Sequence, residues 1–306
     1  MDHQHRQMSS SSSGGRGGGP SIPQTLWDLH IPLYITHTSL PNTPFVASVP
    51  RFGYLALLLP RLASYFGLPC SSFHHEGVLL RNLAVGLLVD LYQPTLPWRL
   101  TVGDGMSWDI GDTFLNSAKE ADFVRNGNAQ QIMSLSKEHT TALWNAVRDN
   151  DYPAFNKVNS RLLNTSRELK NVPIRVYIPQ SAGPQGDKDG PAAAAGAFKV
   201  VQSLVQARMN ESTFHLAFLL AAILSVYIAA GGLETNKESS TGAPQTIGAA
   251  LRGLLPRLFP SSRDPVLANV VLHGAHVPFS APLEELMRDA AYPDGWICLV
   301  VVPLDV

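Results

Sequence analysis

The sequence predicts an α+β fold in which two similar units of strands and helices flank a helix-rich middle region. Strand and helix patterns alternate over residues 26–102, helical periodicity dominates residues 109–163, and strand patterns return from residue 172. Short matches between the two flanks indicate an internal repeat. Each flank has the order β-β-α-β-β with a helix across its sheet, which is the ubiquitin-like β-grasp pattern.

The repeat rests on three pairs of matching residues. An LLPRL run occurs at residues 58–62 and again at residues 254–258. Further along the chain, Glu76-Gly77 corresponds to His273-Gly274, and Trp98 corresponds to Trp296. Because all three pairs lie 196 to 198 residues apart, we predict two copies of one structural unit.

The amino-acid composition distinguishes an N-terminal tail and an apolar insert from the two repeated units. The first twenty residues are polar and rich in serine and glycine, so we expect a disordered tail without a signal peptide or a phosphate loop. The predicted regions are the tail at 1–20, an N-terminal ubiquitin-like domain at 21–105, a helix-rich region at 106–168, and a C-terminal ubiquitin-like domain at 169–306 with an apolar insert at about 206–244.

In the N-terminal unit, alternating apolar residues predict strands and helical spacing predicts one helix. Pro60 falls inside the helical pattern, which indicates a kink or a late helix start. The predicted elements are strands at Leu26–Thr38, Phe45–Val49, Val78–Leu80 and Trp98–Val102, a helix at Tyr54–Phe66, and a short apolar element at Val85–Tyr92.

The middle region and the C-terminal unit follow the same rules. The first middle helix is predicted from an N-cap at Asp112 to a stop at Asn126–Gly127. Two more helices are predicted at Lys137–Arg148 and Tyr152–Leu163. The C-terminal unit has predicted strands at Pro173–Ile178, Phe198–Val205, Val266–Leu272 and Trp296–Val302, and predicted helices at Thr246–Phe259 and Ser280–Tyr292.

The stretch Leu216–Leu233 contains 18 residues without a charge, which is the length of a transmembrane candidate. It falls between the second strand and the helix of the C-terminal unit. A single membrane pass would put those two elements on opposite sides of a bilayer. We therefore favour an insertion, either helical or poorly ordered, or a retained non-coding segment in the gene model.

The composition excludes several functional classes. A net charge of −1 over 306 residues gives no electrostatic footprint for nucleic acid. Charged residues make up only 15%, so large weakly polar surfaces must be covered internally or by partners. The two cysteines, Cys70 and Cys298, have no metal-like spacing and indicate a reduced cytoplasmic compartment with both thiols packed as small apolar groups.

The sequence also contains no convincing catalytic or cofactor-binding set. The Gly-x-Ser-x-Gly, His-Glu-x-x-His and Cys-x-x-Cys motifs are absent, as is Gly-x-Gly-x-x-Gly after a strand. The run His74-His75-Glu76 suggests a metal site at first sight, but adjacent strand residues face opposite ways. We therefore predict a loop or surface position for it, no metal, no cofactor and no self-contained enzyme.

Lys119 is the most exposed reactive group that the helical pattern predicts. The apolar face of its helix consists of Ile110, Phe114, Ala118, Ala121 and Val124, which places Lys119 on the opposite side, facing solvent. It is also the first lysine in the chain. A lysine beside Glu120 and Asp122 is usually only a solvated charge, so its function must be inferred from other parts of the sequence.

Several longer motifs resemble the autophagy protein 5 family in its fungal form. The resemblance covers roughly residues 21–306 without the insert. The sequence departs from the family in residues 79–84, which read LLRNLA in place of an aromatic run, and in the apolar insert itself. The motifs are residues 96–102 (LPWRLTV), 116–122 (NSAKEAD), 125–127 (RNG), 132–136 (IMSLS), 143–144 (LW), 172–176 (VPIRV) and 291–296 (AYPDGW).

The resemblance implies a scaffold that is itself a conjugation substrate. In this family the lysine of the KEAD motif, here Lys119, accepts the C-terminal glycine of the ubiquitin-like autophagy protein 12 through an isopeptide bond, made by E1-like and E2-like enzymes. The conjugate binds the N-terminal helix of the coiled-coil autophagy protein 16 in a groove between the domains. The complex acts like an E3 enzyme and promotes transfer of autophagy protein 8 to phosphatidylethanolamine during autophagosome formation.

The same resemblance implies a location in the cytoplasm and, peripherally, at the preautophagosomal structure membrane. An attacking lysine must lose a proton, and we expect the E2-like enzyme to promote this while the chain supplies only placement. Leu115 and Phe123 lie four residues before and after Lys119, so they form either a docking patch for the modifier or E2, or part of the packing against a ubiquitin-like domain.

Two alternatives stay open at this point. A membrane-anchored adaptor would use the apolar segment 216–233 as its anchor. A non-covalent scaffold would bind the same partners without conjugation at Lys119.

Overall fold

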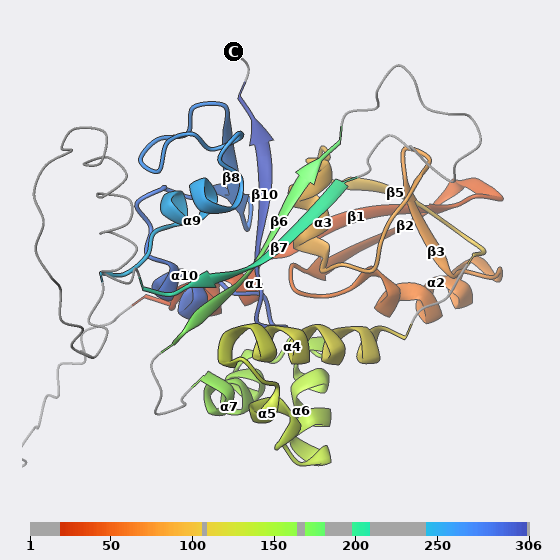
Figure 1. Ribbon diagram of the computed structural model, residues 1–306. Coiled ribbons are helices and arrows are strands. Elements are labelled where there is room, and N and C mark those ends of the chain that lie inside the picture. The colour runs from red at the N-terminus through yellow and green to blue at the C-terminus, as the bar shows by residue number, and fades with distance from the viewer. Residues whose placement is uncertain (1–18, 106–108, 164–168, 181–197, 209–242, 305–306) are drawn as a thin grey trace, which may run out of the picture.

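The computed structural model describes residues 19–105, 109–163, 169–180, 198–208 and 243–304. Two five-stranded sheets lie side by side, and a group of helices lies along one end of both (Figure 1). Segment 216–233 lies outside the described residues, as do most of the predicted insert and the first eighteen residues of the predicted tail. Among the described residues, no helix is both long and apolar enough to cross a membrane.

The N-terminal unit is built from one sheet and four short helices. Pro60 lies in the first turn of its helix, so the predicted late start is confirmed. The elements are α1 (Ile22–Asp28), β1 (His30–His37), β2 (Leu40–Pro50), the 3₁₀ helix η1 (Leu55–Leu58), α2 (Leu59–Phe66), β3 (Ser72–His75), β4 (Val78–Leu79), α3 (Val85–Tyr92) and β5 (Trp98–Gly103).

One N-terminal strand was predicted too long. The strand predicted at Leu26–Thr38 begins only at His30, because the preceding residues form α1. The hydroxyl of Ser21 accepts the N–H of Gln24, and Pro23 stands in the first turn, so a helix start precedes the strand. The run predicted at a loop or surface position begins in strand β3 with the partly buried His74 and His75 and ends at the exposed turn residue Glu76.

The middle region contains four helices, namely α4 (Ile110–Asn126), α5 (Gln130–Met133), α6 (Lys137–Arg148) and α7 (Tyr152–Leu163). The bounds of α6 and α7 agree with the prediction. The N-cap of α4 is Asp109, whose carboxylate accepts the N–H of Asp112, so the cap predicted at Asp112 was wrong by one turn. Gly127 ends α4 with a φ of 76°, a left-handed conformation that glycine adopts without strain.

The C-terminal unit repeats the order of the first. The helix predicted at Thr246–Phe259 ends at Leu254, because Pro256 has no N–H to continue it. The helix predicted at Ser280–Tyr292 is shorter at both ends. The elements are β6 (Asn171–Pro179), β7 (Phe198–Gln206), α9 (Ile247–Leu254), β8 (Ala268–Leu272), β9 (Ala275–His276), α10 (Leu283–Asp289) and β10 (Ile297–Pro303).

Both sheets have the same topology. Their strand orders are β2-β1-β5-β3-β4 and β7-β6-β10-β8-β9. In each, the first and last strands of the unit pair in parallel at the centre, as β1 with β5 and β6 with β10, and the other pairs are antiparallel. The predicted α+β fold with two β-grasp units around a helical region is therefore confirmed.

The repeat holds at two of its three matches. Glu76-Gly77 and His273-Gly274 both form the turn of a short hairpin, with φ values of 51° and 81° in the first and 53° and 81° in the second. Trp98 and Trp296 are both fully buried beside the closing strand. The LLPRL runs are not equivalent. The first run leads into the start of α2, whereas the second run begins at the last residue of α9 and continues beyond that helix.

A buried ion pair links the two units. The guanidinium of Arg51, after β2, donates to the carboxylate of Asp90 on α3 at 2.6 Å and to the carbonyl of Gly86 at 3.2 Å. Its Nε also lies 3.4 Å from Nδ1 of His273, in the β8–β9 turn of the other unit. Asp90 receives backbone N–H groups of His273 and Gly274, so one carboxylate connects both units.

His273 completes this junction as a neutral imidazole. Its Nε2 lies 2.8 Å from the carbonyl of Ala290, and its ring packs 4.6 Å from Tyr292. Burial lowers the pKa of His273 to about 3, and the charge of Arg51 acts in the same direction. The histidine therefore favours the folded state only while it is uncharged.

We predict a pH-dependent loss of stability at this histidine. The unfolded chain binds the proton near pH 6.5, so the free energy of unfolding decreases as the pH falls from about 6.5 towards about 3. His273→Asn removes this contribution and tolerates the φ of 53°. In urea unfolding, the stability difference between wild type and variant should shrink between pH 7 and pH 4.5.

The titration of Asp90 does not account for the expected difference between wild type and His273→Asn. Burial raises its pKa, which acts in the opposite sense, but the carboxylate is present in both proteins. A stability difference that stays constant over this pH range would contradict the assignment to His273.

The packing of α5 on α4 gives a second prediction. Asp122 is buried, and its carboxylate accepts the side-chain amide of Asn126 at 2.7 Å and the backbone N–H of Ile132 at 2.9 Å. Asp122→Ala leaves both donors unpaired and should lower the free energy of unfolding by about 1–3 kcal/mol in urea titrations. Asp122→Asn keeps one acceptor oxygen and should cost less. Equal losses for the two variants would show that the hydrogen bonds are not the cause.

Candidate functional site

Lys119, the predicted acceptor, lies in the middle of α4. Phe114, Ala118 and Ala121 are buried on the opposite face, as the sequence predicted, whereas Val124 is only partly buried. The side chain of Lys119 is itself partly buried, so it is more enclosed than the helical pattern predicted. Its Nζ lies 3.5 Å from Oδ1 of Asn116, one turn earlier.

The two carboxylates next to Lys119 in sequence are bound elsewhere. Asp122 is buried against α5, as described above, and Glu120 pairs with Arg175 of β6 at 2.7 Å. In the part of the chain that the structure describes, Lys119 forms no ion pair. Its amine is therefore held by one weak hydrogen bond to a neutral amide and is available to a partner.

The predicted docking patch divides into two different environments. The ring of Phe123 is 57% exposed, which leaves it available for contact. Leu115 is partly buried and packs against the central core. Met133, on the neighbouring helix α5, is 66% exposed and was not predicted. An exposed apolar surface beside Lys119 therefore involves Phe123 more than Leu115.

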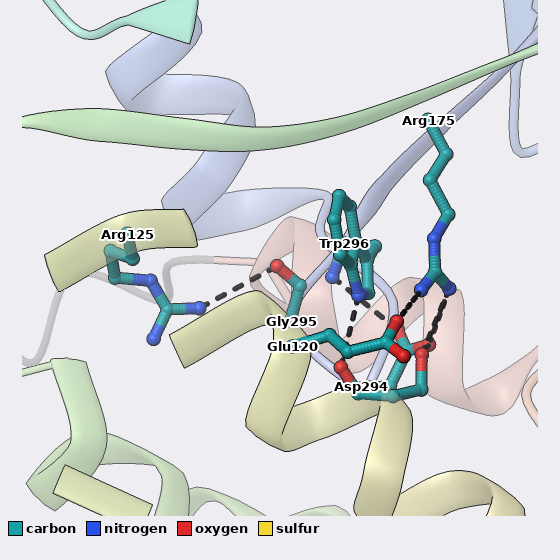
Figure 2. Close-up of polar contacts among 7 residues, drawn as sticks. Glu120, Arg125, Arg175, Asp294, Gly295 and Trp296 are labelled. Atoms are coloured by element: carbon teal, nitrogen blue, oxygen red, sulfur yellow. Dashed lines mark hydrogen bonds and ion pairs between the residues drawn. The ribbon is translucent and has the colours of Figure 1, made fainter. Parts of the chain in front are cut away.

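The side of α4 away from Lys119 is fixed to the C-terminal unit (Figure 2). Arg175 donates to Oγ of Ser117 at 2.8 Å and to the carboxylate of Glu120 at 2.7 Å. The guanidinium carbon lies 3.9 Å from the ring centroid of Trp296. The indole N–H of Trp296 donates to the carbonyl of Ser117 at 3.0 Å, and Oγ of Ser117 donates to Asp294 at 2.7 Å.

The last turn of α4 has a separate contact with the same loop. Arg125 donates to the carbonyl of Gly295 at 3.5 Å (Figure 2). Gly295 has a φ of 84°, and a side chain there would meet Arg125 at 2.7 Å, so this position requires glycine. Burial lowers the pKa of Arg125, and the charge of Asp122 partly restores it. The AYPDGW motif at residues 291–296 thus anchors α4 to the C-terminal unit.

A groove of about 630 Å³ lies between the N-terminal helix, the middle region and the C-terminal unit. Its lining combines aromatic and aliphatic side chains with charged groups at α10. No sequence pattern marked it, because its walls come from three distant segments. The principal contributors are Leu26 and Trp27 of α1, Phe155 and Asn159 of α7, and Met287 and Arg288 of α10.

Within the described ranges, no group of three or more histidine, cysteine, aspartate or glutamate side chains could hold a metal ion. Both cysteines are free thiols there, Cys298 buried and Cys70 partly buried. Burial raises the pKa of the Cys298 thiol well above its usual value, so it remains protonated and inert.

Comparisons with known proteins agree with this architecture. The family model described as "Autophagy protein ATG5, alpha-helical bundle region" matches residues 109–165, and "Autophagy protein ATG5, UblB domain" matches residues 233–301. Autophagy protein 5 of Chaetomium globosum is 64% identical, covering 92% of this chain and 90% of the relative. Autophagy-related protein 5 of Neurospora crassa is 62% identical, covering 93% of this chain and 72% of the relative.

A solved structure gives the same fold at low sequence identity. The crystal structure of Kluyveromyces marxianus Atg5 matches with a TM-score of 0.63 and 18% identity, over 92% of this chain and 99% of that chain. This likeness supports the fold alone. The identity and coverage of the fungal relatives establish the family. The chain belongs to the autophagy protein 5 family, and its role lies in autophagy and the ubiquitin-like conjugation that autophagy uses.

Proposed function

We propose that Lys119 is the acceptor of the ubiquitin-like autophagy protein 12, and that the chain is the substrate and scaffold of this conjugation. The observation that supports the proposal most is the state of the amine. Lys119 is held on a well-anchored helix, yet Asp122 and Glu120 are engaged with other partners. The amine therefore needs to break only its contact with Asn116 to react.

The proposed reaction is an acyl transfer. The E2-like enzyme carries the modifier as a thioester between its cysteine and the C-terminal glycine of the modifier. After Nζ of Lys119 loses a proton to the enzyme or to water, its lone pair attacks the thioester carbonyl. The C–N bond forms and the C–S bond breaks. The departing thiolate takes up the second amine proton, so the products are the isopeptide and the free cysteine thiol of the enzyme.

The exposed ring of Phe123 supports a role in docking. It lies on the turn after Lys119 and is more than half exposed, so a modifier or E2-like enzyme bound over α4 would cover it. Leu115 contributes less, because it already packs against the core. We assign the docking patch beside Lys119 chiefly to Phe123, and Leu115 contributes only through its packing against the core.

The groove is our proposed site for the N-terminal helix of autophagy protein 16. It has an apolar wall in Trp27, Phe155 and Met287 and charged groups in Arg288 and Asp289. An amphipathic helix presents matching apolar and charged faces to such a groove. In the bound complex, the chain would act E3-like only through its partners, by promoting transfer of autophagy protein 8 to phosphatidylethanolamine. We propose that it acts in the cytoplasm and peripherally at the preautophagosomal structure membrane.

A non-covalent scaffold is the second candidate, and the same groove favours it. Binding in the groove does not require conjugation at Lys119, since Lys119 is not among the residues that line the groove. The two functions separate in a reconstituted reaction that follows conjugation and binding independently.

We predict that Lys119→Arg abolishes conjugation without harming the fold. Arginine keeps the positive charge and the helix propensity, so the free energy of unfolding should change by about 0.5 kcal/mol or less. In a reaction with the E1-like and E2-like enzymes, ATP and autophagy protein 12, the slower-migrating conjugate should disappear. Lys137→Arg, at the exposed start of α6, is the matched control and should conjugate normally.

A conjugate that survives in Lys119→Arg would exclude Lys119 as the sole acceptor. Partner binding by the wild type without any conjugate would favour the non-covalent scaffold.

We also predict that filling the groove blocks the partner helix. Asn159 is partly buried in the groove wall, so Asn159→Trp should weaken binding of a peptide of the autophagy protein 16 helix by about tenfold or more in calorimetry. Asn145→Trp, at a partly buried position on α6 outside the lining, is the control. Equal binding by both variants would place the partner elsewhere.

A further inference from the structure

We propose that Arg175 is the positioning residue for the acceptor, because it fixes the rotation of α4 and so the direction in which Lys119 points. This inference rests on the proposed function of Lys119. Arg175 lies in β6, at the centre of the C-terminal sheet, where it pairs with Cys298 of β10 and Gln202 of β7. A sheet centre is a rigid platform from which to hold a helix.

The guanidinium of Arg175 holds two residues that bracket Lys119 in sequence. One amino group donates to Oγ of Ser117 at 2.8 Å and the other to Oε2 of Glu120 at 2.7 Å (Figure 2). Ser117 and Glu120 are neighbours on the helix surface, so the two contacts define a line along α4. Two separated contacts resist rotation of the helix about its axis, which one contact would allow.

The rest of the cluster fixes the guanidinium itself. Trp296 covers one face of its plane at 3.9 Å, and Asp294 lies 3.7 Å from the same amino group that contacts Ser117. Trp296 also donates to the carbonyl of Ser117, and Ser117 donates to Asp294. The side chain of Arg175 is 12% exposed and that of Asp294 is 13% exposed, whereas that of Glu120 is 61% exposed, so solvent screens the contacts with Ser117 and Asp294 less than the ion pair with Glu120.

These contacts leave the face of Lys119 free. At 100° per residue, Ser117 and Glu120 point about 160° and about 100° away from Lys119 around the helix. Arg175 therefore binds α4 on the side away from Lys119 and does not contact the amine. Its effect on the reaction passes through the backbone, which defines a positioning residue and separates it from the catalytic groups of the E2-like enzyme.

Lysine cannot replace this arginine. A planar guanidinium binds Ser117 and Glu120 at the same time and stacks on Trp296, whereas an ammonium group provides a compact charge without a stacking plane. Arg175→Lys thus keeps the charge but removes the geometry. Small errors of placement are costly in group transfer, since a displacement of about 1 Å can reduce a rate by roughly a hundredfold.

The test measures single-turnover conjugation with the E2-like enzyme charged with autophagy protein 12 as the probe. We expect Arg175→Lys to lower the maximal rate at saturating charged enzyme by about tenfold or more. The concentration giving half the maximal rate should change by less than about twofold, because the docking surface at Phe123 is intact. Binding of the autophagy protein 16 helix should remain at the wild-type level.

Arg51→Lys is the matched control for stability. Arg51 is buried and, like Arg175, has a carboxylate partner, but it contacts α3 and the β8–β9 turn rather than α4. It should lower the melting temperature at least as much as Arg175→Lys while keeping the conjugation rate. If Arg175→Lys fails to fold, Ser117→Ala, which removes one of the two held groups, should show the same selective loss of maximal rate.

A wild-type maximal rate in Arg175→Lys and in Ser117→Ala would overturn the inference. So would rate losses that follow melting temperature equally in the Arg175 and Arg51 variants, since stability alone would then explain them. Failure of the underlying proposal has a different signature, because Lys119→Arg would still form the conjugate.

Discussion

The buried pair of Arg51 and Asp90 is the interaction on which the arrangement of the two β-grasp units depends. Both residues belong to the N-terminal unit, yet their hydrogen-bonding capacity is completed by the turn at His273 in the other unit. Removing one partner of a buried pair typically costs about 3–5 kcal/mol, because a charge is left without compensation. Gly86 makes the pair possible, since a Cβ there would collide with the Arg51 side chain.

The middle region gains its position mainly from the C-terminal unit. The loop at Asp294 and Gly295 and the strand carrying Arg175 present one surface to α4. The helix then has one face in the core, one held by the C-terminal unit, and one carrying Lys119 and Phe123. The groove lies where α1, α7 and α10 meet. The acceptor site at Lys119 and Phe123 and the groove are therefore held by the same packed helices, but neither Lys119 nor Phe123 lines the groove.

Local patterns predicted the elements well and the long-range contacts poorly. The bounds of α6 and α7 follow from caps and apolar spacing, which are readable within a few residues. Lys119 was found through its motif and its helix face. Arg175 was not singled out, because its partners Glu120 and Asp294 lie 55 residues before and far after it. The resemblance implied a groove between the domains, but its lining residues could not be predicted for the same reason.

The distribution of the core affects how the protein can be dissected. One buried cluster holds Trp27 and Phe52 together with Phe155 of the middle region and Tyr292 of the C-terminal unit, while a second lies within the N-terminal unit, between its sheet and its helices. A fragment cut at the edge of the first sheet would keep its own small core but present Trp27 and Phe52 to water. A boundary between the two sheets thus separates two units of the same topology. The shared core, however, joins the N-terminal unit, the middle region and the C-terminal unit into one folding unit.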